Sequence, residues 1–247
     1  MQLNTHALLC RNLSAGYSSC ADTVKNIEFH VDSGEIVGII GNNGAGKSTI
    51  IKAILGLTPS ISGNVHICSY SMENQARQAK KHTGYIPEVP LVYSELTLRE
   101  HLMMIAAMYG MDGTAYENSA RELLRSFHLE GKIDYFPSEF SKGMQQKVMI
   151  ICAMLHRPSL YIIDEPFVGL DPLATRTFTG FLFEERSRGA GILMSTHILD
   201  SAEKICDRFI IMSGGRMIAQ GTMSQLCENF GHFESLLDLY IHVSGLE

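Results

Sequence analysis

The chain has 247 residues, of which 45% are hydrophobic and 19% are charged, an ordinary balance for a globular protein. This length suffices for one large domain, or one domain with a subdomain, without support from disulfides or metals. Lys and Arg number 20 against 26 Asp and Glu, so the formal net charge is −6. That charge argues against nucleic acid as the main ligand, because phosphate backbones need a clustered positive surface.

The sequence shows neither the pattern of a membrane span nor that of paired cysteines. No apolar run approaches the ~20 residues that cross a bilayer, and the first residues lack the pattern of a signal peptide. We therefore expect any membrane role to come through a partner. The cysteines are scattered without a C-x-x-C pair, which predicts buried free thiols in a reducing compartment rather than metal ligands. They are Cys10, Cys20, Cys68, Cys152, Cys206 and Cys227.

Short apolar runs alternate with helical patterns along the chain, which predicts an α/β fold with a largely parallel sheet. The middle of the chain is mostly helical and is predicted to form an inserted subdomain. The predicted strands are Val24–Val31, Glu35–Ile40, Val65–Cys68, Thr83–Ile86, Leu160–Asp164 and Gly191–Ser195, with a terminal hairpin of Phe209–Met212 and Arg216–Ala219. The predicted helices are Ser48–Leu55, most of Thr97 to about Leu155, and Pro172–Arg186.

Two local patterns locate helices more closely. Thr97 is followed three residues later by Glu100, the arrangement of a capping box ahead of an apolar run. In the tail, helical spacing of apolar residues predicts an amphipathic helix that packs against its own domain. Those apolar residues are Phe233, Leu236, Leu237 and Tyr240.

A phosphate-binding loop is the most specific motif. Every fixed position of G-x-x-x-x-G-K-S/T is matched, an apolar strand leads in, and a helical pattern with Thr49 leads out. Glycines let backbone N–H groups surround a phosphate, and the following helix start adds further N–H donors. Lys47 suits the β- and γ-phosphates of ATP, and Ser48 offers a hydroxyl to Mg²⁺. The alternative is a glycine-rich turn that happens to precede a helix. The motif reads Gly41-Asn42-Asn43-Gly44-Ala45-Gly46-Lys47-Ser48.

Two adjacent acids, Asp164 and Glu165, end the apolar run Leu160–Ile163. In open α/β sheets ligands bind at the carboxyl ends of the strands, so Asp164 is predicted to face the Mg²⁺ held by Ser48. Glu165 points elsewhere and is predicted to polarise the water that attacks the γ-phosphate. A solvated strand end is the alternative reading.

Three further motifs resemble those of ABC ATPases, the nucleotide-binding subunits of ABC transporters. Phe140–Lys147 resembles the family signature, Gly169–Pro172 the D-loop, and Ser195–His197 the switch histidine. The resemblance covers essentially the whole chain. It implies a P-loop NTPase of the ABC type, with a largely parallel core sheet, an antiparallel β region and an inserted helical subdomain.

The resemblance also implies roles for single residues. Ser141 and Gly143 would bind the γ-phosphate held by an opposite subunit, and Asp171 would link the two sites. His197 would sense the γ-phosphate, although a lone histidine is more often structural. Tyr17 would stack on adenine, and a packed or exposed tyrosine is the alternative.

Two departures from the family pattern lie in functional segments. Glu88 stands where the family usually has glutamine; it can still reach Mg²⁺ or its water, but an ionised carboxylate donates no hydrogen bond. The signature has Lys142 and Met144 in place of Gly and Gln, while Ser141 and Gly143 are kept. We expect an active ATPase.

Within the family, the segment Glu88–Met111 is especially similar to ATPases of Ecs-type bacterial two-component exporters. The resemblance implies a homodimer enclosing two ATP molecules, and a separate polytopic membrane subunit that keeps the chain on the cytoplasmic side of the membrane. Candidate docking segments for that subunit are Glu88–Tyr93 and Leu102–Met111, since methionine packs adaptably; core packing of these methionines is the alternative. The expected division is a core of about 1–88 and 156–221, a helical subdomain of about 89–155, and a tail of 222–247.

Three rival functions share part of this pattern. A soluble ABC ATPase acting on ribosomes or DNA would usually carry two cassettes or a coiled-coil insertion, whereas this chain has one phosphate loop and no heptad run. A small-molecule kinase would need neither the signature nor the D-loop. A nucleotide-gated binding module would not need Glu165 and His197. No feature identifies a transported substrate.

Overall fold

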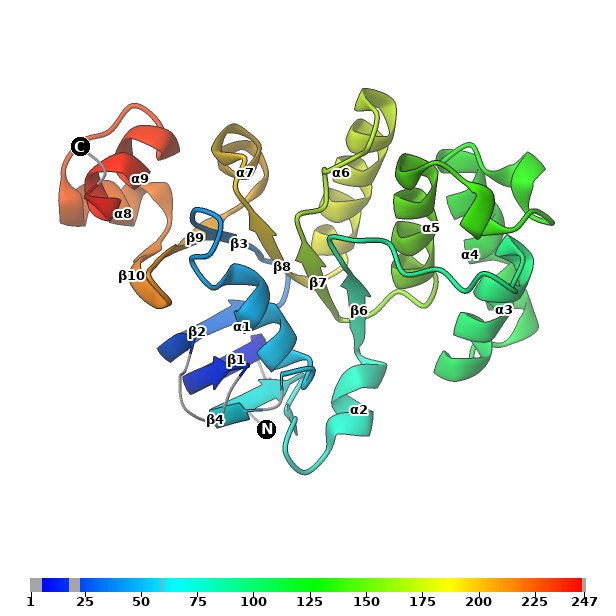
Figure 1. Ribbon diagram of the computed structural model, residues 1–247, viewed down its shortest axis with the longest axis horizontal. Helices are drawn as coiled ribbons and strands as arrows, with labels where there is room; N and C mark the ends of the chain where they lie inside the picture. Colours follow the sequence, from blue (N-terminus) through cyan, green and yellow to red (C-terminus); the bar gives the residue numbers. More distant parts are fainter. Residues whose placement is uncertain (1–5, 18–22, 59, 246–247) are drawn as a thin grey trace.

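The computed structural model describes residues 6–17, 23–58 and 60–245, so Cys20 lies outside the described part. Two β-sheets form the centre of the molecule, with a group of helices at each end of its long axis (Figure 1). Helices α3, α4 and α5 gather at one end, and α8 and α9 lie at the other. No helix in the described ranges is long and apolar enough to cross a bilayer.

The core sheet has the strand order β10-β9-β3-β8-β7-β6. Five of its strands run parallel, and β10 forms an antiparallel hairpin with β9. This arrangement confirms the predicted largely parallel sheet and the predicted terminal hairpin. The strands are β3 (Ile36–Ile40), β6 (Thr83–Ile86), β7 (Leu160–Asp164), β8 (Gly191–Thr196), β9 (Arg208–Ser213) and β10 (Arg216–Gly221).

Both faces of the core sheet are buried, which explains why its strands are continuous apolar runs. On β3, Val37 and Ile39 pack into the core on one side of the sheet, while Ile36 and Ile40 pack into the core on the other. The same alternation holds on β7, β8 and β9. Because strand side chains alternate between faces, one short segment serves two cores.

A second, antiparallel sheet has the strand order β2-β1-β4-β5. Helix α1 (Lys47–Ile54) lies between the two sheets (Figure 1), and its Ile50 packs in one cluster with Leu8 of β1 and Val37 of β3. The longest strand, β1, is absent from the predictions because its register shifts break the period-two pattern. The strands are β1 (His6–Gly16), β2 (Val24–Asp32), β4 (Ser60–Ile67) and β5 (Tyr70–Ser71).

The helical middle of the chain forms as predicted. Thr97 caps α3 by accepting from the Glu100 N–H, and the Glu100 carboxylate accepts from the Thr97 N–H, so the predicted capping box is confirmed. The helices of this group are α3 (Leu98–Tyr109), α4 (Gly113–Ser126) and α5 (Lys142–Met154), with 3₁₀ turns η1 (Glu130–Lys132) and η2 (Pro137–Glu139). The helices on the core are α2 (Ala76–Lys81), α6 (Pro172–Ser187) and α7 (Leu199–Ile205).

The tail forms α8 (Met223–Phe230) and α9 (Leu236–Ser244). Packing of the tail on its own domain is confirmed, because α9 buries Leu236 and Tyr240 in the main core. The predicted apolar stripe needs two corrections. Phe233 precedes the helix, since Ser235 caps it, and Leu237 is 45% exposed on the outer side of α9.

The described cysteines are all free thiols. Cys10, Cys152 and Cys206 are buried, as predicted, and burial raises the pKa of the Cys152 thiol to about 12. The prediction of burial is wrong for Cys68 and Cys227, which are partly exposed. Cys68 follows β4 in a left-handed turn with φ of +47° and packs, partly buried, at the margin of a core cluster.

Candidate functional site: a nucleotide pocket at the carboxyl edge of the core sheet

The loop between β3 and α1 wraps around a buried lysine. Lys47 is 6% exposed, and its Nζ donates to the carbonyl oxygens of Gly41 at 2.8 Å and Asn42 at 3.4 Å. Gly46 is the N-cap residue just before α1, with φ of +104° and no side-chain cap hydrogen bond. A Cβ at Gly46 would lie 2.5 Å from Val24 Cγ1, so only glycine fits. The first N–H groups of α1 therefore remain available to an anion.

The carboxyl ends of β7 and β8 deliver polar side chains next to this loop. Asp164 is 3% exposed, and its Oδ1 accepts a hydrogen bond from Ser48 Oγ at 3.2 Å. Ser195 Oγ from β8 donates to the same oxygen. Residues far apart in sequence meet here because parallel strands end at a common edge.

Glu165 is the most constrained acid in the site. It is 6% exposed and adopts φ of +48°, a left-handed conformation that a residue other than glycine rarely takes. Its backbone N–H donates to Ser195, to the carbonyl oxygen and to Oγ, each at 3.2 Å. The Glu165 carboxylate lies between two other side chains. Its Oε1 lies 3.5 Å from Lys47 Nζ, and its Oε2 lies 2.8 Å from His197 Nδ1.

A pocket of about 550 Å³ opens over these groups. It brings together much of the phosphate loop with Glu88, Glu165 and His197, as the sequence predicts for one site. Thr23 and Val168 also line it, and no motif marks either residue. The complete lining is Thr23, Asn43, Gly44, Gly46, Lys47, Ser48, Thr49, Glu88, Glu165, Val168 and His197.

Tyr17 lies outside that lining. Its side chain is 56% exposed, and Lys52 Nζ of α1 is 5.8 Å from the centre of its ring. The ring is therefore open to solvent beside the helix that follows the phosphate loop. An exposed face of this kind is available for stacking.

The signature segment lies at the start of α5, apart from the pocket lining. Ser141 caps α5, with its Oγ accepting from the Met144 N–H at 3.3 Å. Gly143 passes so close to the D-loop that an added Cβ would lie 2.5 Å from the Gly169 carbonyl oxygen. Both residues therefore have a structural role within the chain: Ser141 caps a helix, and Gly143 allows close packing against the D-loop.

Asp171, in the D-loop, also connects the D-loop to the signature helix α5. It caps α6 by accepting from the Ala174 N–H at 2.8 Å, and it pairs with Lys147 Nζ of α5 at 2.7 Å. The hydrogen bond from Lys147 holds the pKa of the Asp171 carboxyl below its usual range. The signature helix and the D-loop are thus fastened to each other.

The tail also reaches the phosphate loop. The backbone N–H of Asn42 donates to the Tyr240 hydroxyl of α9 at 3.0 Å. The sequence offers no signal for this contact, because the two residues are 198 positions apart.

Residues 24–168 match the family described as "ABC transporter", which is more than half of the chain. The chain belongs to this family. The ATPase is 44% identical to the Bacillus subtilis "ABC-type transporter ATP-binding protein EcsA" over 238 residues, 96% of each chain. It is 36% identical to the Rhizobium etli "Nod factor export ATP-binding protein I", covering 83% of this chain and 65% of that one.

A solved structure described as "Structure of ATP binding subunit of ABC transporter" superposes with a TM-score of 0.93 at 46% identity. It covers 96% of this ATPase and 99% of its own chain. The predicted ABC-type fold and the narrower Ecs-type resemblance are confirmed. The ATPase is a subunit that binds and hydrolyses ATP to power an ABC transporter, so the small-molecule kinase reading is wrong.

Proposed function

We propose that Gly41–Thr49 cradles the triphosphate of ATP, that Glu165 accepts a proton from the attacking water, and that His197 contacts the γ-phosphate. The single observation that carries this proposal is the position of the Glu165 carboxylate between Lys47 Nζ and His197 Nδ1. Bound phosphate oxygens would take over the contacts that Lys47 makes to carbonyl oxygens and to Glu165. The acid would then be released toward a water beside the γ-phosphate.

Mg²⁺ fits the donor set at this edge, because it prefers oxygen ligands. Ser48 and Asp164 already meet through oxygen atoms 3.2 Å apart, and Glu88 lines the same pocket. We propose these three residues as the groups that hold the ion or its water. When bound, the ion would neutralise charge on the phosphates.

The remaining nucleotide contacts are proposed to come from Tyr17 and from a second copy of the chain. Tyr17 would stack on adenine with its exposed ring. Ser141 and Gly143 of one copy would meet the γ-phosphate bound by the other, with Asp171 joining the two sites. The N-terminus of α5 supports this role, since its N–H groups attract an anion.

We propose that this homodimer drives an exporter, on the cytoplasmic side of the membrane, through a separate polytopic subunit. The Nod factor export relative supports the direction of transport. The docking surface would comprise Glu88–Tyr93 and Leu102–Met111. Apolar side chains are exposed in both segments, with Leu91 at 69% and Met108 at 66%.

The division into a core of about 1–88 and 156–221, a helical subdomain of about 89–155 and a tail of 222–247 remains our proposal. The separate placement of α3–α5 supports it (Figure 1).

The experiment is a pull-down of the tagged chain from detergent-solubilised cells, with mass spectrometry of the partners. We expect a stoichiometric polytopic membrane protein, lost in Leu91→Asp and kept in Leu57→Asp. Leu57 is a matched control, because it is 58% exposed after α1, outside the docking segments. Both variants should still hydrolyse ATP in the absence of the membrane partner. Recovery of only soluble proteins, ribosomes or DNA would contradict the transport proposal and leave the ATP chemistry intact.

A further inference from the structure

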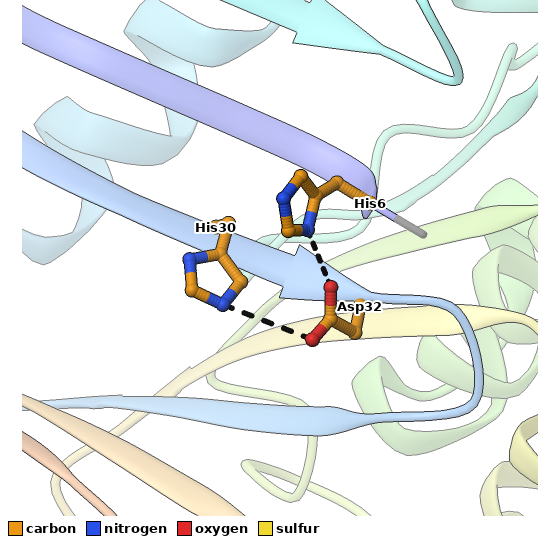
Figure 2. A group of neighbouring side chains, drawn as sticks. All are labelled: His6, His30 and Asp32. Carbon is orange, nitrogen blue, oxygen red and sulfur yellow. Dashed lines mark hydrogen bonds and ion pairs between the residues drawn. The ribbon is translucent and has the colours of Figure 1, made fainter. Parts of the chain in front are cut away.

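Two histidines and an aspartate meet on the outer face of the antiparallel sheet (Figure 2). His30 and Asp32 lie two positions apart on β2 and are partly exposed. Val31 between them and Phe29 before them are buried. Strand alternation therefore directs His30 and Asp32 to the same side. His6 joins them from the neighbouring strand β1.

A β-bulge brings His6 to this face. Leu8 pairs with Val31, so a regular ladder would place Ala7 opposite Asp32, yet His6 is the residue that pairs with Asp32. Ala7 and Leu8 are consecutive and both buried, so β1 has one more inward-facing residue here than regular alternation allows. Without this bulge, the His6 side chain would point into the core.

The donor atoms converge as Figure 2 shows. His6 Nδ1 is hydrogen-bonded to Asp32 Oδ1, and His30 Nε2 lies 3.8 Å from Asp32 Oδ2. One ligand atom from each of the three residues lies within 4.8 Å of the others. Within the described ranges, this is the one such group of three possible ligands. The side chains are 41–42% exposed, so water can complete a coordination shell.

We propose that His6, His30 and Asp32 form a site for a divalent transition-metal ion, with Zn²⁺ as the reference ion. Two imidazoles with one carboxylate suit Zn²⁺, Ni²⁺ or Cu²⁺ and are a poor match for Mg²⁺ or Ca²⁺. The site thus differs in chemistry from the oxygen donors of the nucleotide pocket.

The charges around the three residues and their place in the fold both favour a metal site that is separate from the nucleotide pocket. The nearby Arg208 guanidinium donates to the His30 carbonyl oxygen, and its charge is paired with Glu35 through bonds of 2.7 and 3.0 Å. Asp32 ends β2, ahead of the start of β3, whereas the phosphate loop follows the far end of β3. A bound ion would hold β1 to β2 without touching ATP. It would stabilise the folded state by mass action.

The test is a Zn²⁺ titration of the full chain, read by competition with a chromophoric chelator. Mg²⁺ and ADP are kept saturating so that the nucleotide pocket is blocked. We expect one Zn²⁺ per chain, with affinity at least about tenfold weaker in His30→Ala and in Asp32→Asn. At a hundredfold excess over Kd, Zn²⁺ should raise the Tm of the parent by about 5–10 °C.

His66→Ala is the matched control, because His66 lies opposite Leu9 on the same sheet and is outside the group of three. It should bind Zn²⁺ like the parent. Asp32→Asn is nearly isosteric and keeps the test decisive if His30→Ala is unstable. Equal Zn²⁺ affinity in the parent and Asp32→Asn, or an equal loss in His66→Ala, would overturn the site and leave a simple cross-strand hydrogen bond.

Discussion

The nucleotide pocket and the signature region place their motif residues in opposite ways within this fold. In the pocket, Lys47, Glu165 and His197 come from three distant segments, and Glu165 contacts both of the others. In the signature region, Ser141 and Asp171 cap helices and do not line that pocket. One half of an ATP site is thus assembled inside the chain, while the other half is a surface. If the proposed two-copy site is right, this difference implies that turnover requires a second copy, whereas phosphate binding does not.

The largest effect is expected from Glu165→Gln. Removing the proton acceptor should lower phosphate release by about 10²–10⁴-fold, because general-base catalysis contributes this much. ATP binding, measured by calorimetry, should persist. Glu184→Gln is the control, since Glu184 is an exposed acid paired with Arg188 on α6. Unchanged hydrolysis in Glu165→Gln would remove this residue from the mechanism.

Lys47→Ala tests the half of the site that lies within one chain. Loss of a buried cation should weaken ATP binding by about 10–100-fold, the scale of hydrogen bonds to a charged group. Calorimetry on the isolated chain measures it. Lys80→Ala on α2 removes an exposed lysine and should leave the affinity unchanged. Equal ATP affinity in Lys47→Ala would contradict the phosphate-loop assignment.

Ser141→Ala tests the half that needs a second copy. Turnover should fall at least about tenfold, as for loss of a transition-state donor, while ATP affinity of the isolated chain stays constant. The lost helix cap should also lower Tm by about 2–4 °C. Ser235→Ala removes a matching cap from α9 and should lower Tm without slowing turnover. If both variants slow turnover equally, Ser141 acts through stability alone.

The smallest effect is expected from Tyr240→Phe, which removes the hydroxyl that accepts from the Asn42 N–H. One neutral hydrogen bond is worth about 1 kcal/mol, so KM for ATP should rise about two- to tenfold with kcat kept. Tyr109→Phe is the control, because it loses a comparable bond to the Thr83 carbonyl oxygen. A KM change in both variants would mean that tail and loop are not specifically coupled.

Prediction from the sequence succeeded where a segment is determined by its own residues. The β7 strand, the Thr97 capping box and the loop between β3 and α1 follow from local patterns of apolar, capping and glycine residues. Prediction failed at β1, where register shifts break the alternation that identifies a strand. The tail helix was predicted to include Phe233, but it begins at Leu236, after its cap Ser235.

The sequence by itself determined the parallel core, the family and the candidate residues for ATP, because motif chemistry requires particular residues at short, fixed spacings. Only the tertiary structure decided which of these residues share a pocket and which lie on another surface. It also decided the Tyr240 contact to the phosphate loop and the meeting of His6 with His30 and Asp32. The reason is physical: strand order, a bulge and helix docking set distances between segments that no local pattern encodes.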